Sequence, residues 1–284
     1  MSLELFDTHC HIHEMVRRTT PVYDKWHEDA QKRYRDGEPE RTPEAVIESA
    51  HRVGVNRMLC VGTTLADSEL ALGFVAEREG LWASIGIHPH EAEKHRSSDA
   101  KRRFAQLLED GPIDRKITAI GECGLDYFYG HSPREAQIEL LRFQIELALE
   151  HGLPLCFHVR EAFDDFWPIF ESYRGAHLRG VLHSYTDNTA NLERAVRHGL
   201  YFGVNGIATF AKSEAQLVIY RTIPQQLLLL ETDAPFLTPI PFRGKVCEPK
   251  HVRVTAEFLA DLREENLEDL AVATTANARA LLKI

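Results

Sequence analysis

Residues 3–11 read Leu3-Glu4-Leu5-Phe6-Asp7-Thr8-His9-Cys10-His11, a short apolar run followed by two histidines that one residue separates. Side chains two apart in an extended chain point the same way, so the imidazoles of His9 and His11 can face one point. A His-x-His pair alone is weak evidence for a metal site, because most such pairs bind nothing. The pair becomes informative because an apolar run with a metal-capable residue behind it recurs along the chain.

Short apolar runs alternate with longer helix-like stretches throughout the sequence. The runs are residues 3–6, 55–61, 81–87, 117–120, 155–157, 180–182, 200–204 and 227–230. The helix-like stretches are 43–53, 66–78, 99–109, 133–151, 162–173, 189–198, 214–220, 252–263 and 267–282. Such alternation favours βαβ units and a parallel sheet. Eight strand–helix pairs predict a single-domain (β/α)₈ barrel over residues 1–284, with a doubly wound open sheet as the alternative.

Composition narrows the function classes. The chain has 284 residues, and a (β/α)₈ barrel commonly takes about 250. A formal net charge of −10 disfavours a general nucleic-acid-coating surface, although bound cations can supply positive charge locally. We expect no membrane span and no secretory signal, because neither apolar pattern is present. Five scattered cysteines without a Cys-x-x-Cys pair predict buried, reduced thiols in a cytoplasmic protein.

Metal-capable residues follow four of the later apolar runs. Glu122 follows the fourth run, His158 the fifth, His183 the sixth and Asp233 the eighth. The carboxyl ends of barrel strands meet on one face, so these four side chains and the first two histidines should converge. Any one of them could be a buried polar group with ordinary partners. Six in the same register are hard to explain in that way.

The mixture of imidazole and carboxylate indicates the kind of metal centre. Such a set suits Zn, Mn, Fe or Ni, whereas an all-oxygen set suits Mg better. Four histidines and two carboxylates suffice for two divalent ions that keep open positions for water and substrate. We expect Glu122 to bridge the two ions and Asp233 to take the proton from the attacking water. The predicted cofactors are two divalent ions, with Zn, Mn and Mg as candidates.

Five stretches carry a resemblance to a known family. They are Gly86-Ile87-His88-Pro89-His90; Gly121-Glu122-Cys123-Gly124-Leu125-Asp126-Tyr127; His158-Val159-Arg160-Glu161-Ala162; Gly203-Val204-Asn205-Gly206 with Thr209-Phe210; and Glu231-Thr232-Asp233-Ala234-Pro235 with Pro241-Phe242-Arg243-Gly244-Lys245. The chain resembles the TatD-type deoxyribonucleases of the amidohydrolase superfamily, from the first histidine pair to Thr275-Ala276-Asn277.

The resemblance implies a (β/α)₈ barrel and divalent-metal-dependent hydrolysis, typically of phosphodiester bonds in DNA. It implies the metal ligands His9, His11, Glu122, His158, His183 and Asp233. It also implies that His88 contacts the substrate. Several positions depart from the family pattern: His13, Cys247, the Ser184-Tyr185-Thr186-Asp187 segment and a long insert over residues 14–41. None of these departures removes a ligand, but all touch the expected substrate-facing rim.

Three basic residues are candidates for contacts with phosphate. Arg160 lies two positions after His158 and should share its face, so it could clamp a phosphate or pair with a neighbouring carboxylate. Arg243 and Lys245 lie in a proline-rich loop, where they could bind phosphate or remain solvated. Tyr127 and Phe128 could stack on a base or pack the top of the barrel.

These features support one leading hypothesis and two alternatives. The first is a metal-dependent phosphodiesterase, an exonuclease that acts on single-stranded or frayed DNA ends. The second keeps the barrel and the ions but hydrolyses an ester, amide or lactone. The third is a subunit of a larger complex in which the insert 14–41 docks a protein partner. We expect a monomer or a weak oligomer that does not enter a membrane.

Overall fold

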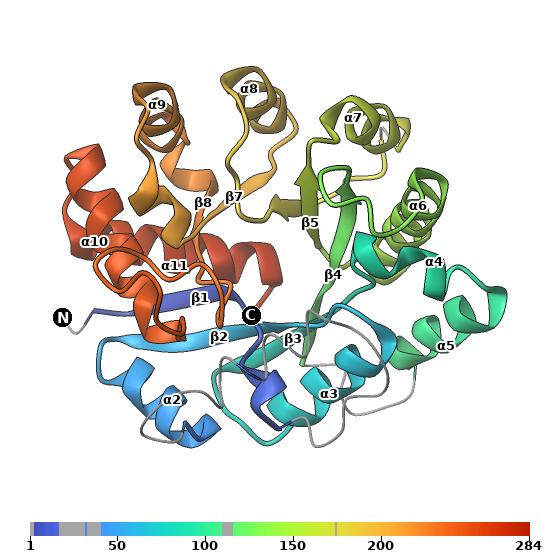
Figure 1. Cartoon of the computed structure of the whole chain (residues 1–284), viewed down its shortest axis with the longest axis horizontal. Helices are drawn as coiled ribbons and strands as arrows, with labels where there is room; N and C mark the ends of the chain where they lie inside the picture. Colours follow the sequence, from blue (N-terminus) through green and yellow to red (C-terminus); the bar gives the residue numbers. More distant parts are fainter. Residues whose placement is uncertain (1–2, 17–31, 33–40, 110–115, 174) are drawn as a thin grey trace. The chain divides into compact units, whose positions relative to one another are not determined.

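The computed structural model describes residues 3–16, 32, 41–109, 116–173 and 175–284 (Figure 1). Its strands are β1 (Leu5–Cys10), β2 (Val55–Val61), β3 (Leu81–Ile85), β4 (Ile117–Asp126), β5 (Leu155–Arg160), β6 (Gly180–Leu182), β7 (Tyr201–Val204) and β8 (Leu228–Leu230). Its α-helices are α2 (Pro43–His51), α3 (Leu65–Val75), α4 (Ala92–His95), α5 (Ser98–Glu109), α6 (Arg134–His151), α7 (Phe163–Ser172), α8 (Thr189–Arg197), α9 (Glu214–Thr222), α10 (Val252–Arg263) and α11 (Leu267–Leu282).

The chain forms two compact units, which we describe separately. Unit 1 comprises Met1–Cys60 and Ser184–Ala280, and unit 2 comprises Val61–His183 and Leu281–Ile284. The organisation of residues 1–284 as one domain stays a prediction. Apart from residues 14–16, 32 and 41, the insert 14–41 lies outside the described residues, so its expected role as a docking surface stays a prediction.

Unit 1 brings the first and last strands of the protein together. Strand β1 pairs with β2 and β7 pairs with β8, both in parallel. Beyond the end of β8, the Asp233 amide donates to the carbonyl of His9, and the His11 amide donates to the carbonyl of Ala234, each at 2.8 Å. A parallel bridge joins Cys10 to Ala234. A last strand that meets the first is the arrangement of a barrel and not of an open sheet, so the predicted (β/α)₈ fold is confirmed.

Unit 2 is a run of four parallel strands in chain order. Strand β4 lies between β3 and β5, and β5 also pairs with β6. Helix α3 packs on β3, α6 on β4 and α7 on β5, as Figure 1 shows. The aromatic rings of Phe157, Phe166 and Phe170 meet edge to face or stacked where α7 covers β5. This packing places the carboxyl ends of β4 and β5 side by side.

Three strands extend past the apolar runs that predict them. Strands β1, β4 and β5 continue to Cys10, Asp126 and Arg160, so His9, Glu122 and His158 lie within strands rather than behind them. His9 was expected to follow its strand, and that was wrong, because the strand continues to Cys10. Glu122 and His158 follow their apolar runs as expected and lie in the C-terminal halves of their strands, where Gly124 pairs with His158 in register. The five cysteines are buried and free, as predicted.

Candidate active site

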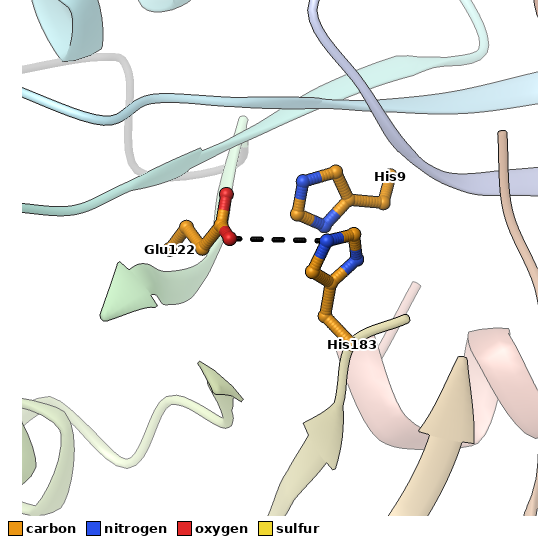
Figure 2. A group of neighbouring side chains, drawn as sticks. All are labelled: His9, Glu122 and His183. Carbon is orange, nitrogen blue, oxygen red and sulfur yellow. Dashed lines mark ion pairs between the residues drawn. The ribbon is translucent and has the colours of Figure 1, made fainter. Parts of the chain in front are cut away.

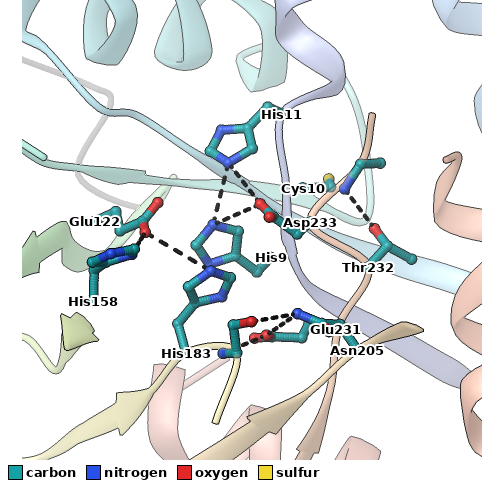
Figure 3. A network of polar contacts seen from close by, with 12 residues as sticks. His9, Cys10, His11, Glu122, His158, His183, Asn205, Glu231, Thr232 and Asp233 are labelled. Atoms are coloured by element: carbon teal, nitrogen blue, oxygen red, sulfur yellow. Dashed lines mark hydrogen bonds and ion pairs between the residues drawn. The ribbon is translucent and has the colours of Figure 1, made fainter. Parts of the chain in front are cut away.

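Two histidines and an aspartate converge in unit 1. The Nε2 atoms of His9 and His11 lie 3.2 Å apart. Oδ1 of Asp233 lies 3.3 Å from Nε2 of His11 and 3.7 Å from Nε2 of His9 (Figure 3). Both imidazoles are fully buried, and the carboxylate retains limited exposure. Three atoms with lone pairs therefore point at one another in a buried place, which is the donor set that a divalent cation needs.

The backbone around this cluster is held by a buried carboxylate on β1. Asp7 accepts hydrogen bonds from the hydroxyl of Thr232 at 2.6 Å and from the Thr232 amide at 2.9 Å. Burial raises the pKa of Asp7 well above its usual value, against the lowering effect of these hydrogen bonds. Asp233 follows directly with φ at +61°, a left-handed backbone that a non-glycine residue adopts at a cost. Asp7 thus orients the segment that carries Asp233.

A second buried carboxylate in unit 1, that of Glu231, holds Ser184, the residue after His183, in place through a hydrogen bond. Glu231 accepts a hydrogen bond from the Ser184 amide at 2.7 Å and from the side-chain amide of Asn205 at 3.2 Å (Figure 3). Asn205 also donates to the hydroxyl of Ser184 at 2.9 Å. Gly203 makes room for this arrangement, because a Cβ there would lie 2.1 Å from Oε2 of Glu231. The network fixes Ser184 at φ +51°.

In unit 2, one oxygen of Glu122 faces three imidazoles. Oε1 lies 2.8 Å from Nδ1 of His158, 3.5 Å from Nε2 of His88 and 3.8 Å from Nε2 of His183. Figure 2 shows the His183 ring directed at this carboxylate. Burial raises the pKa of Glu122, but the nearby His88 and His183 and the hydrogen bond from His158 outweigh it and hold the pKa well below the usual value. Glu122 is therefore a charged carboxylate at the centre of a histidine cluster; its role as a bridging ligand stays a prediction.

Asp126 holds the other side of the His158 ring. Oδ2 of Asp126 lies 2.9 Å from Nε2 of His158 and 3.1 Å from Nε2 of His90. Burial lowers the pKa of His158, but its hydrogen bonds to Asp126 and Glu122 raise it overall to about 9. Gly124 sits opposite His158 in the ladder, at φ +150°, and a Cβ there would lie 1.8 Å from the carbonyl oxygen of His158. Only glycine allows β4 and β5 to approach this closely.

His88 is placed in the same cluster, where a substrate contact was expected. Its Nδ1 accepts a hydrogen bond from the His90 amide at 3.2 Å, which leaves Nε2 to carry the proton that faces Glu122. Burial lowers the pKa of His88 to about 4, so the ring is neutral. Ligand-capable atoms of His88, Glu122 and His158 all lie within 4.8 Å of one another. Its role as a substrate contact stays a prediction.

The three basic candidates all stack on aromatic rings. The guanidinium carbon of Arg160 lies 4.1 Å from the ring centre of Phe128, and that of Arg243 lies 4.5 Å from the ring centre of Phe210. Nζ of Lys245 lies 5.7 Å from the ring centre of Phe242. All three basic side chains are exposed. Their contacts with phosphate stay predictions.

Two of the departures from the family pattern are buried. His13 and Cys247 have no exposed surface. The His13 ring centre lies 5.9 Å from that of His11. Neither residue reaches the surface in this structure, and their place on the substrate-facing rim stays a prediction.

The sequence reasoning did not single out Asp126, His90 or Asn205. A signal for Asp126 was present: Glu122, Gly124 and Asp126 alternate along a strand and so share one face. Asn205 directly follows β7, which is the strand end at which the other polar residues were sought. His90 lacked such a signal, because its place depends on the short 3-10 helix Pro89–Glu91.

Comparisons with known proteins agree with this geometry. The family described as TatD related DNase matches residues 6–283. This chain belongs to that family. A metal-dependent hydrolase of Bacillus subtilis is 35% identical over 85% of this chain and 92% of its own length. The 3'-5' ssDNA/RNA exonuclease TatD of Erwinia amylovora is 33% identical over 83% of this chain and 92% of its own length.

A solved structure shows the same fold over the whole chain. The TatD homologue YjjV of Escherichia coli K12 superposes with a TM-score of 0.83 at 27% identity, and the match covers 100% of both chains. The predictions of the TatD family, of a metal-dependent hydrolase that acts on phosphoester bonds and of a (β/α)₈ barrel are confirmed. The use of divalent metal is supported by the relatives and by the donor groups in both units.

Proposed function

We propose that this TatD-family protein is a divalent-metal-dependent exonuclease that removes nucleotides from single-stranded or frayed ends of DNA. The observation that carries the proposal is the convergence of His9, His11 and Asp233 in a buried place with partial access at the carboxylate. The relative in Erwinia amylovora, named an exonuclease on single-stranded DNA and RNA, supports the substrate class. The net charge of −10 fits an enzyme that engages chain ends better than one that coats duplexes.

We propose two divalent ions as cofactors. Their ligands would be His9, His11, Glu122, His158, His183 and Asp233. The donor sets fit Zn or Mn, with Mg as the third candidate. Bound divalent ions supply positive charge that stabilises the anionic transition state and make the attacking water more acidic. The chain's own residues then have to bind the phosphate and move the proton.

The protein groups have distinct tasks in this proposal. Asp233 accepts the proton of the attacking water, since its carboxylate contacts the His9 and His11 rings and keeps some exposure, whereas the nearby carboxylates of Asp7 and Glu231 are fully buried. Glu122, whose pKa is held low by the surrounding histidines, would be a charged ligand that could be shared by both ions. Asp126 positions the His158 ring through its Nε2 atom, which leaves Nδ1 on the side of Glu122. His88 and the basic residues Arg160, Arg243 and Lys245 would contact the substrate.

Hydrolysis of labelled oligonucleotides tests the proposal. The purified protein, stripped with a chelator and reloaded with Mg²⁺, Mn²⁺ or Zn²⁺, should shorten single-stranded DNA from its ends and spare blunt duplex. His9→Ala should abolish the reaction, and Asp233→Asn should slow it about 100-fold or more, as expected for loss of a general base. Arg52→Ala is the matched control, since this residue caps the end of α2, is 64% exposed and pairs with Glu48 on that helix, away from the proposed ligands. A loaded wild type that leaves every oligonucleotide intact would refute the proposal.

The same preparation tests the other expectations. Hydrolysis of an ester, amide or lactone without any cleavage of DNA would select the acyl alternative, which no observation here favours. The predicted monomeric or weakly associating state can be checked by light scattering. The predicted protein partner at residues 14–41 can be checked by truncating this segment. No helix among the described residues is long and apolar enough to cross a membrane. The five free cysteines are compatible with the predicted cytoplasmic location.

A further inference from the structure

Two aromatic rings stand exposed immediately after β4. The side chains of Phe128 and Tyr129 are 51% and 52% exposed, and their ring centres lie 4.8 Å apart at 88°. Tyr127, the aromatic residue before them, is partly buried instead, because its hydroxyl donates to Asp165 at 2.7 Å and Arg134 covers its ring. Among these three aromatic residues, Phe128 and Tyr129 are the two whose side chains are more than half exposed. We call this pair the aromatic platform.

A guanidinium group lies against the platform. The guanidinium carbon of Arg160 is 4.1 Å from the ring centre of Phe128 and 4.8 Å from that of Tyr129. The His131 ring stacks on Tyr129 at 5.6 Å, with an angle of only 6° between the planes. Arg160 is itself exposed. The platform therefore combines an exposed apolar ring with a positive charge over part of its face, and a ligand would use the ring surface that Arg160 leaves open.

The platform is held in place by the carboxylate that also holds His158. Oδ1 of Asp126 accepts hydrogen bonds from the amides of Phe128 at 3.0 Å and Tyr129 at 2.9 Å. Oδ2 of the same group contacts His158. Gln137 on α6 bonds both the amide and the carbonyl of Asp126. Little conformational entropy is left to lose when a ligand binds, because the segment is already fixed.

We propose that the Phe128 ring, flanked by Tyr129, stacks on a nucleobase of a single-stranded substrate, while Arg160 attracts the adjoining phosphate. The proposal rests on the proposed nuclease function and names a subsite for it. Every base has a face that can stack on an aromatic ring, so the subsite would tolerate any sequence. A base inside a duplex is covered by its neighbours, so the subsite would favour single strands or frayed ends. The cation beside the ring suits an anionic ligand.

Fluorescence of 2-aminopurine tests the stacking directly. The probe is a single-stranded oligonucleotide with a hydrolysis-resistant phosphorothioate backbone and 2-aminopurine near its end, mixed with the full chain and Mn²⁺. Stacking on Phe128 should quench the fluorescence. Phe128→Ala combined with Tyr129→Ala should weaken binding about tenfold to a hundredfold. The single variant Phe128→Trp keeps an aromatic ring at this position and should bind about as tightly as the wild type. Val272→Ala removes another exposed apolar side chain, 66% exposed on α11, and should bind like the wild type.

An oligonucleotide with an abasic site in place of 2-aminopurine supplies the second comparison. The oligonucleotide is kept to a few nucleotides, so that the abasic position is the one that reaches the platform; wild type and the double alanine variant should then bind it with nearly equal affinity, because no base is present at that position to stack. If both proteins bind the base-containing strand with equal affinity, the proposal that the platform stacks on a base is refuted. The exposed rings would then be explained by another ligand, such as a protein. Thermal melting confirms that the variants are folded. Failure of the nuclease proposal is distinguishable, since it would appear as no cleavage of an ordinary oligonucleotide by the wild type.

Discussion

The close approach of β4 and β5 at Gly124 gives the sharpest test of how the strands position His158. A Cβ at Gly124 would lie 1.8 Å from the carbonyl oxygen of His158, and ordinary contact begins at 3.4 Å. Gly124→Ala must therefore push the two strands apart by about 1.6 Å or bend them, at φ +150°. Overpacking costs about 1–3 kcal/mol and the disfavoured backbone about as much again, so we expect a loss of about 2–6 kcal/mol in the free energy of unfolding.

Urea unfolding of Gly124→Ala and of a matched variant separates the two contributions. Gly152 ends α6 at φ +63° and has no atom within 4 Å of an added Cβ, so Gly152→Ala isolates the backbone cost at about 1 kcal/mol. Gly124→Ala should also lose bound metal, because His158 shifts with the strand. Equal destabilisation by the two substitutions, with metal content unchanged in both, would refute the reasoning.

Two further predictions concern single buried groups. Burial lowers the pKa of His251 to about 4 from its usual 6.5, and its Nδ1 accepts from the Glu248 amide at 3.0 Å. The unfolded chain therefore binds this proton first as the pH falls. The contribution of His251 to the free energy of unfolding should be full above pH 6.5 and should fall by about 3 kcal/mol between pH 6.5 and pH 4. Urea unfolding at several pH values should therefore show a shallower decline in His251→Gln than in the wild type. Identical pH profiles of the two proteins would contradict this. Asp126→Asn should weaken metal affinity about 10- to 100-fold in a metal titration, while Asp165→Asn should not, and equal affinities in the two variants would speak against a positioning role.

Much of the fold follows from the sequence because the apolar pattern is regular. Strand β2 and helices α10 and α11 begin and end at the predicted residues. The strands that carry Glu122 and His158 run longer than predicted. The end of an apolar run predicts that the strand ends there. These two strands continue past their apolar runs, and the polar side chains of Glu122 and His158 are satisfied by each other and by Asp126.

The candidate ligands were accessible to sequence reasoning for a related physical reason. Carboxyl ends of parallel strands share an edge, so a polar residue at each strand end can be recognised without coordinates. Residues that act through another side chain lack this regularity: the roles of Asp7 and Glu231 depend on where Thr232 and Ser184 lie in space. The exposure of Phe128 and the burial of Tyr127 were equally open until the contacts of Asp165 and Arg134 were known.

Metal content measured on the purified chain and on one variant from each unit tests the central claim most directly. The wild type, loaded with Mn²⁺ or Zn²⁺ and freed of excess metal, should retain about two ions per chain, as two divalent ions need two such donor sets. His11→Ala and Glu122→Ala should each retain fewer ions and lose hydrolysis of single-stranded DNA together with them. A wild type that hydrolyses DNA without any bound metal, or variants that keep their full metal content, would contradict the account.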